Sequence, residues 1–259
     1  MTGMILLKSP AEIALIHKAS IIVAEILEEL AANVKPGVTT DELDRVAEDL
    51  TYRKGALPAF KGYKPHDVAY PKTLCVSVND EIVHGIPSGR RLKPGDIVGL
   101  DFGVIYQGFY GDAARTVPVG KISGRAEELL RVTRAALYAG IEQAQVGNRI
   151  SDIARAVQRT AESGGFSVVT DFAGHGIGRS LHEDPQVPNY VRRGMPNPRL
   201  QEGMALAIEP MINEGVPELR ILDDGWTAVT ADGKLSAHFE HSIAITARGP
   251  RILSEMANV

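Results

Sequence analysis

The sequence predicts an α+β fold built from two similar halves. In each half, two segments with helical periodicity precede segments typical of antiparallel strands. A weak internal similarity also recurs at an offset of 110 residues, where the matching positions are Gly37 and Gly147, Leu43 and Ile153, and Gly55 and Gly165. No linker rich in Pro, Gly and Ser divides the chain. We therefore expect one catalytic domain over residues 1–259, with halves of about 10–120 and 121–259.

Two helices open the first half. The residues "SPAE" at 9–12 have the form of a capping box with Pro10 at the first helical position. Apolar residues at helical spacing follow, which predicts a helix over about 10–33 that "KPG" stops. A second capping box, "TTDE" at 39–42, predicts a helix that ends near Gly55.

The pattern then changes to strands. The segment 73–79 is rich in residues that favour strands. Two further segments, 96–106 and 109–119, flank Gln107 and Gly108, which predicts a hairpin with a two-residue turn.

The second half repeats this order. A helix is expected over 125–145, where Gly147 breaks it, and a second over 151–165. Strands are then expected at 204–212, 226–230 and 237–246.

The composition is that of an ordinary globular chain. Hydrophobic residues make up 44% and charged residues 23% of its 259 residues, with a net charge of -4. This charge favours neither nucleic acid nor a membrane surface as a partner. Cys75 is the single cysteine, so no disulfide forms within the chain. The apolar run near the N-terminus is too short for a signal or membrane segment, so we expect a cytoplasmic protein.

Two aspartates lie in the predicted hairpin. Asp101 interrupts an apolar strand, where a charge is costly unless it is paired, bound to metal or turned to solvent. Asp112 lies beyond the turn, and the two numbers have an odd sum, so both side chains point to one face, directly opposite or diagonally. Two like charges at such a distance repel each other. A divalent cation between them removes that repulsion.

Glu209 and Glu240 also lie in apolar segments. Each alone is compatible with a solvated strand edge, but four such carboxylates are harder to explain in this way. Together they carry four negative charges, which two divalent metal ions would neutralise. Carboxylates with histidine suit Mn, Fe, Co or Zn better than Ca. The pattern indicates a dinuclear metallohydrolase.

Histidines in segments rich in Gly and Pro complete the pattern. His175 and His182 lie in "GHGIGRSLHEDPQVPNY", with a spacing too wide for one helical face, so a shaped loop or a bulged strand must place them. His84 lies in "VHGIP". One of the three is expected to bind metal, and the others to transfer protons or to steady an oxyanion. The other four are expected to be structural or at the surface: His17, His66, His238 and His241.

Five blocks in this order resemble the type I methionine aminopeptidases: "VNDEIVHGIP", "LDFG" with "GDAARTV", "GHGIGRSLHEDPQVPNY", "IEP" and "HFEHSIAIT". The resemblance covers essentially the whole chain. It implies the pita-bread fold, in which two pseudo-symmetric α+β halves surround a central antiparallel sheet. It also implies removal of the initiator methionine from nascent chains whose second residue is small.

The resemblance also implies residue roles. Asp101 is a metal ligand, Asp112 and Glu240 bridge two metal ions, and His175 and Glu209 bind the second ion. Glu209 also carries a proton from water, while His84 contacts the substrate and His182 supports the tetrahedral intermediate. The implied partners are the N-termini of nascent polypeptides, with association with the ribosome left open. The family is commonly monomeric.

The methionine pocket is expected in the strip "PAFKGYKPHDVAYPKTLC" and at the single tryptophan. The candidates are Phe60, Tyr63, Tyr70, Cys75 and Trp226, and ordinary core packing is the alternative for each. The sequence departs from the family at "KPHDVA", residues 64–69, where a shorter link is usual.

Three other functions compete with this interpretation. An X-Pro aminopeptidase or prolidase shares the expected fold and ligands, but usually carries an extra N-terminal domain. A binding protein without metals would leave the clustered carboxylates without a counter-charge. A broad-specificity amidase with two metals is the third.

Overall fold

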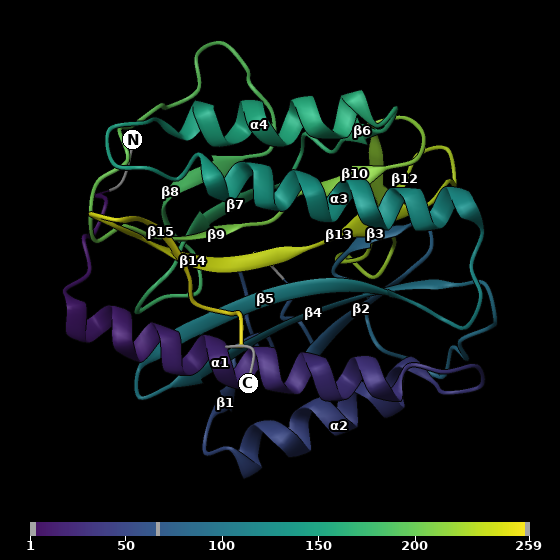
Figure 1. The fold of residues 1–259 in the computed structure, drawn as a ribbon. Coiled ribbons are helices and arrows are strands. Elements are labelled where there is room, and N and C mark those ends of the chain that lie inside the picture. Colours follow the sequence, from purple (N-terminus) through teal and green to yellow (C-terminus); the bar gives the residue numbers. More distant parts are fainter. Residues whose placement is uncertain (1–3, 66–67, 257–259) are drawn as a thin grey trace.

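The computed structural model describes residues 4–65 and 68–256. Within these residues the two halves each contribute a pair of helices, with the strands between the pairs (Figure 1). The helices are α1 (Pro10–Asn33), α2 (Thr40–Arg53), α3 (Gly124–Glu142) and α4 (Ile150–Ser163). All four predicted helices are confirmed, with ends within a few residues of those expected.

Both predicted capping boxes are present. The Ser9 side chain accepts a hydrogen bond from the backbone N–H of Glu12, and the Glu12 side chain accepts one from the backbone of Ser9. Thr39 and Glu42 repeat this exchange at the start of α2. Such caps satisfy backbone donors that a helix leaves unpaired at its start. The sequence alone therefore sets where these helices begin.

The internal similarity corresponds to equivalent local structure. Helices α2 and α4 begin and end at positions that differ by 110 in the numbering. Gly37 precedes α2 with φ of 91°, and Gly147 precedes α4 with φ of 92°. A side chain is disfavoured at such left-handed backbone positions, which explains glycine at both.

A nine-stranded antiparallel sheet forms the centre, with strand order β1-β4-β5-β14-β9-β7-β8, while β2 pairs with β4 and β15 with β14. Its strands are β1 (Leu57–Pro58), β2 (Leu74–Val78), β4 (Ile97–Tyr106), β5 (Phe109–Pro118), β7 (Ala173–Gly176), β8 (Glu183–Pro188), β9 (Ala205–Ile208), β14 (Glu240–Thr246) and β15 (Gly249–Ile252).

Two small sheets lie beside it, one with the order β13-β10-β6 and the other with the order β11-β12-β3. Their strands are β3 (Glu81–Val83), β6 (Ser167–Val168), β10 (Met211–Asn213), β11 (Leu219–Ile221), β12 (Ala228–Thr230) and β13 (Ser236–His238).

Two predicted strands are each divided in the structure. The strand expected over 204–212 becomes β9 and β10, with Glu209 and Pro210 between them. Proline lacks the N–H that a continuous ladder requires. The strand expected over 237–246 becomes β13 and β14, separated by Phe239. Between β9 and β10 the chain passes from the large sheet to a small one, and between β13 and β14 it passes from a small sheet to the large one. A carboxylate, Glu209 or Glu240, lies at each of these divisions.

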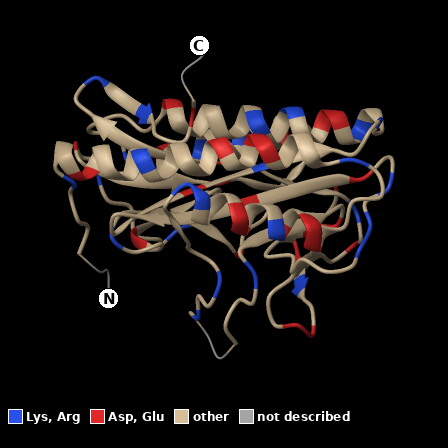
Figure 2. Ribbon diagram, turned by 90° about the horizontal axis from the view of Figure 1, so that it is seen from below, with Lys and Arg blue, Asp and Glu red and all other residues tan. Residues whose placement is uncertain are grey.

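The helices cover the outside of the strands (Figure 1). Helix α1 packs closely on β5, because Gly111 has no side chain to collide with the backbone of Ala19 and Ser20. Lys, Arg, Asp and Glu are interspersed along the helices and loops (Figure 2). None of the helices among the described residues is long and apolar enough to cross a membrane.

Candidate active site

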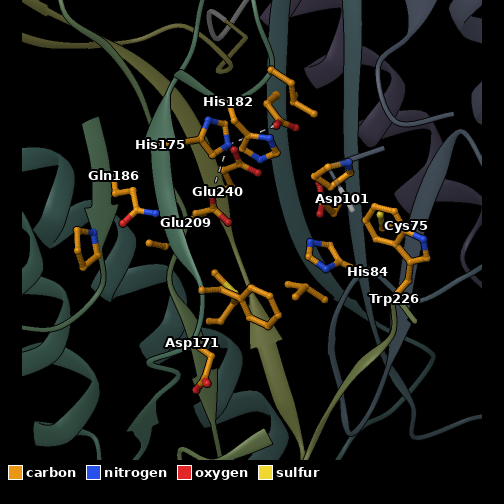
Figure 3. A pocket seen from close by; sticks show the side chains of 18 of the residues that line it. Cys75, His84, Asp101, Asp171, His175, His182, Gln186, Glu209, Trp226 and Glu240 are labelled. Carbon is orange, nitrogen blue, oxygen red and sulfur yellow. Dashed lines mark ion pairs between the residues drawn. The ribbon is translucent and has the colours of Figure 1, made fainter. Parts of the chain in front are cut away.

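All twelve residues predicted to form the site line one cavity of about 860 Å³. Figure 3 shows His175, Glu209 and Glu240 close together, Cys75, His84 and Trp226 gathered in another part of the cavity, and Asp101 near Cys75. The twelve residues are Phe60, Tyr63, Tyr70, Cys75, His84, Asp101, Asp112, His175, His182, Glu209, Trp226 and Glu240.

Strand register explains how the carboxylates meet. Asp101 on β4 pairs with Ala114 on β5, and Ala114 pairs with Glu240 on β14. Residues paired across strands share a face, so Asp101 and Glu240 point to the same side of the sheet. Asp112 pairs with Gly103, two positions from Asp101, and therefore lies diagonally to it. Of the two arrangements that the sequence allowed, the structure has the diagonal one.

Glu209 reaches the same place from β9. Ile208, the last residue of β9, pairs with His241 on β14, so Glu209 lies beside Glu240. Asn189 donates a hydrogen bond of 3.0 Å from its side chain to the backbone carbonyl of Glu209. This contact fixes the main chain where the ladder stops.

His175 enters from a bulged strand. The pairing of β7 with β8 shifts register between Gly174 and Gly176, so the bulge expected for this segment is present. Its Nδ1 lies 2.9 Å from the carbonyl oxygen of Gly176, which can only accept, so Nδ1 carries the proton. The lone pair on Nε2 then faces the cavity. Nε2 lies 3.9 Å from Asp112 Oδ2 and 3.5 Å from Glu209 Oε1.

These atoms fit a divalent cation. Asp112, His175 and Glu240 each offer a ligand atom, and the three atoms lie within 4.8 Å of one another. All three side chains are buried, and neither Asp112 Oδ1 nor Glu240 Oε1 has a hydrogen-bond partner among the described residues. Buried acceptors without a donor are costly. A cation satisfies them and the lone pair of His175 together, which supports the use of a divalent metal.

The pKa values of these side chains also indicate that the site requires a cation. Without a cation, burial raises the pKa of Asp101 to about 7. Burial and repulsion from neighbouring carboxylates raise the pKa values of Asp112 and Glu240 well above their usual range. Burial lowers the pKa of His175 to about 3, so this ring is neutral at physiological pH. A neutral imidazole and ionised carboxylates are the forms that bind metals.

His84 and His182 lie on either side of this cluster. The backbone of His84 is left-handed, with φ of 61°, and its ring contacts Phe172 and Trp226 edge-on. Such a conformation is strained for a residue with a side chain, and strain of this kind gathers at functional sites. The rings of His182 and His175 meet edge-on, with centroids 4.2 Å apart, and His182 Nδ1 lies 2.5 Å from the Tyr63 hydroxyl.

The pocket candidates form one apolar cluster against the cavity. Phe60, Tyr70 and Cys75 are buried, while Tyr63 and Trp226 pack against them. The rings of Tyr70 and Trp226 meet edge-on, with their centroids 5.1 Å apart. These side chains therefore belong to the core and to the cavity wall at once. The segment 64–69 joins Tyr63 to Tyr70 at this wall, and its residues 66 and 67 lie outside the described residues.

One of the four remaining histidines lies close to the site. His238, expected to be structural or at the surface, is buried, and its Nε2 lies 3.7 Å from Glu209 Oε2. Its position two residues before Glu240 was the available signal, because alternate strand residues share a face. His17 and His241 do have structural roles, since their Nδ1 atoms form hydrogen bonds with Leu253 and Ser254. His66 lies outside the described residues.

Other residues of the cavity wall were missed. Phe172, Leu181 and Met211 line the cavity, although each looks like ordinary core in the sequence. No local pattern distinguishes an apolar residue that faces a cavity from one that faces the core.

Known proteins resemble this chain over nearly its whole length. The model of metallopeptidase family M24 matches residues 14–247. The methionine aminopeptidase of Clostridium perfringens is 53% identical to this chain, over 97% of this chain and 99% of that protein. The crystal structure of methionine aminopeptidase from Thermotoga maritima is 46% identical, with a TM-score of 0.93, and the match covers 98% of this chain and all of that one.

The competing prolidase interpretation has weaker support. The prolidase of Pyrococcus furiosus is 22% identical with a TM-score of 0.78, and this chain covers 66% of its length. That likeness extends to the fold alone, which is the pita-bread fold expected from the sequence. The higher sequence identities are instead to methionine aminopeptidases. The chain belongs to metallopeptidase family M24, and within it to the methionine aminopeptidases.

Proposed function

We propose that this protein removes the N-terminal methionine from peptides and nascent proteins whose second residue is small, with two divalent metal ions at its site. One observation carries the proposal. A cluster of carboxylates with His175 and a cluster of aromatic side chains line one cavity, in a chain 53% identical to a methionine aminopeptidase.

Five side chains would hold the two ions: Asp101, Asp112, His175, Glu209 and Glu240. The four carboxylates balance two divalent charges, and the mixed oxygen and nitrogen ligands suit Mn, Fe, Co or Zn. When bound, such ions polarise a carbonyl and lower the pKa of water.

Glu209 moves the proton in this proposal. Its carboxylate accepts a proton from the attacking water and passes it to the departing amine. Without a cation, burial and the neighbouring Asp101 raise the pKa of Glu209 well above its usual range, and bound cations would oppose this rise. The Asn189 contact with its main chain, 3.0 Å long, limits how far Glu209 can move.

His182 and His84 act on the substrate carbonyl and its neighbouring peptide group. In this proposal the Tyr63 hydroxyl donates to His182 Nδ1 across their 2.5 Å contact, so the ring proton stays on Nε2. That N–H then donates to the oxygen on which charge develops. His84 is held between Phe172 and Trp226, and burial lowers its pKa to about 4, so it acts as a neutral ring.

The aromatic part of the cavity receives the methionine side chain. Phe60, Tyr63, Tyr70, Cys75 and Trp226 offer ring edges and a soft sulfur. An unbranched thioether adapts to such a wall, and sulfur contacts aromatic edges favourably.

The proposal extends to the setting of the reaction. The whole chain acts as one catalytic domain and as a monomer, in the cytoplasm, on the N-termini of nascent chains. Sedimentation of the purified metal-loaded protein checks the monomer, and a stable dimer would contradict it.

Substrate comparison tests the proposed function. After chelation and stepwise return of each metal, kcat/KM is measured for Met-Ala-Ser, norleucine-Ala-Ser, Val-Ala-Ser, N-acetyl-Met-Ala-Ser and an X-Pro peptide. We expect cleavage of the first two, because a hydrophobic pocket separates near-isosteres by only about 1–3 kcal/mol. Equal rates on the valine or acetylated peptide would return the protein to the general metallohydrolases. Preference for the X-Pro peptide would favour a prolidase.

A further inference from the structure

Glu183, the residue after His182, forms a buried ion pair with Lys8. Lys8 Nζ is 2.6 Å from Glu183 Oε2, and the two side chains are only 6% and 9% exposed. Lys8 Nζ also donates to the carbonyl of Leu6, and the Lys8 backbone donates to Gly203. Removing two charges from water is costly, and an apolar pair of similar volume is often as stable. Stability alone therefore does not account for this pair.

Glu183 organises the turn that precedes it. Its second oxygen, Oε1, accepts hydrogen bonds from the backbone N–H groups of Arg179 and Ser180, at 2.8 and 3.2 Å. One carboxylate thus joins Lys8 to the turn 178–183. His182 is the residue next to Glu183, so the same contacts set the position of its main chain.

The space around the pair is closed. A Cβ on Gly178 would collide with the Lys8 side chain and approach Glu183 Oε1 to 2.7 Å. Lys8 therefore lies against the backbone of the turn, with no room for a side chain between them. The segment that leads into α1 forms one wall of the loop that carries His182.

The ring of His182 has few other restraints. Its Nδ1 contacts the Tyr63 hydroxyl, and its face lies near the His175 ring. The residue itself is exposed toward the cavity. The position of this ring therefore depends on its backbone and on its contacts with Tyr63 and His175.

We propose that Lys8 and Glu183 are positioning residues for His182, holding its backbone so that its ring meets both Tyr63 and the substrate. This inference rests on the proposed function for the role of His182 in the reaction. A misplacement of about 1 Å can lower a catalytic rate by about 10²-fold. Neither residue lines the cavity, so both act through His182.

The main test is Lys8→Met, in protein loaded with Zn²⁺. Substrate kinetics on Met-Ala-Ser, metal content, melting temperature and the ¹⁵N signal of the His182 ring are measured together. We expect kcat to fall by about 10–10²-fold, with KM changed less than about threefold and metal content unchanged. The His182 signal should move toward its position in Tyr63→Phe, while the His17 signal stays in place.

Val157→Ala is the control, because Val157 is buried on α4 against Gly140 of α3 and does not line the cavity. It should lower the melting temperature and leave kcat and the His182 signal unchanged. The double variant Lys8→Met with Glu183→Gln should regain melting temperature without regaining kcat. If Lys8→Met does not fold, Glu183→Gln alone serves, because it keeps the shape of the side chain and weakens only the ion pair.

Three outcomes separate the possibilities. If kcat and the His182 signal of Lys8→Met match those of Val157→Ala, the pair is merely structural and the inference is wrong. Loss of metal from Lys8→Met would also overturn it, because the pair would then act on the metal site. If the wild-type protein does not cleave Met-Ala-Ser but the ring signal still moves, the proposed function fails and the positioning role stands.

Discussion

The β4–β5 hairpin and the β7–β8 pair both bring side chains to the cavity, but they do so in different ways. The hairpin pairs without interruption from Ile97 and Pro118 to Tyr106 and Phe109. Its turn residues, Gln107 and Gly108, both have positive φ, as a tight hairpin turn requires. The β7–β8 pair is short and shifts register at its bulge.

The difference shows what each region needs from the rest of the molecule. Asp101 and Asp112 are placed by the register of their own hairpin. His182 follows the bulged strand, and its place depends on Tyr63 from one direction and on Lys8, through Glu183, from another. In a regular strand pair, the backbone hydrogen bonds fix where each side chain lies. In an irregular segment, contacts with distant parts of the chain fix it.

The largest expected effect comes from the hairpin. Asp112→Asn should lower kcat/KM on the order of 10⁴-fold, because a lost ligand removes several kcal/mol of stabilisation at about 1.4 kcal/mol per tenfold. Metal content should fall with it. Asp44→Asn is the matched control, since Asp44 is also a buried carboxylate but accepts its hydrogen bonds from Thr73 and Leu74 outside the cavity. Full metal content in Asp112→Asn would remove Asp112 from the proposed ligands.

A smaller effect is expected from the bulged region. His182→Ala should lower kcat by about 10²–10³-fold with little loss of metal, because it removes a donor to the developing charge. The kinetics and metal analysis are done on the same preparation. Collapse of the metal content would mean that His182 is a ligand, and the two regions would then share one role.

Metal removal compares the two regions by stability. A ligand at about 100 times its Kd stabilises by about 2.7 kcal/mol, and a chain of this size gains about 2–4 °C per kcal/mol. Chelation should therefore lower the melting temperature by roughly 5–10 °C, and added metal should restore it. Asp112→Asn should lose most of this shift while His182→Ala keeps it. Equal shifts in both variants would contradict the division proposed here.

The smallest effect concerns one hydroxyl. Tyr63→Phe keeps the ring in the pocket and removes only the hydrogen bond to His182, which is worth about 0.5–1.5 kcal/mol. We expect kcat to fall by about 2–10-fold, with the KM for Met-Ala-Ser little changed. A large rise in KM with unchanged kcat would assign Tyr63 to methionine binding alone.

The sequence by itself determined the local structure. Helix starts follow from the capping boxes at Ser9 and Thr39, because a helix start is satisfied by side chains within one turn. The hairpin follows from Gln107 and Gly108, and its register then places Asp101 and Asp112 on one face. The carboxylates could be singled out because a charge is conspicuous in an apolar strand.

Tertiary structure decided the rest, because the remaining contacts join residues far apart in the chain. Glu209 and Phe239 lie where strands pass between sheets, which no local pattern records. His238 gains its contact with Glu209 only when β13 lies beside β10. Lys8 and Glu183 are 175 residues apart, and each looks like an ordinary surface charge in the sequence. Burial and pairing are properties of the packed chain, so the contact of Lys8 with Glu183, next to His182, is apparent only in the folded structure.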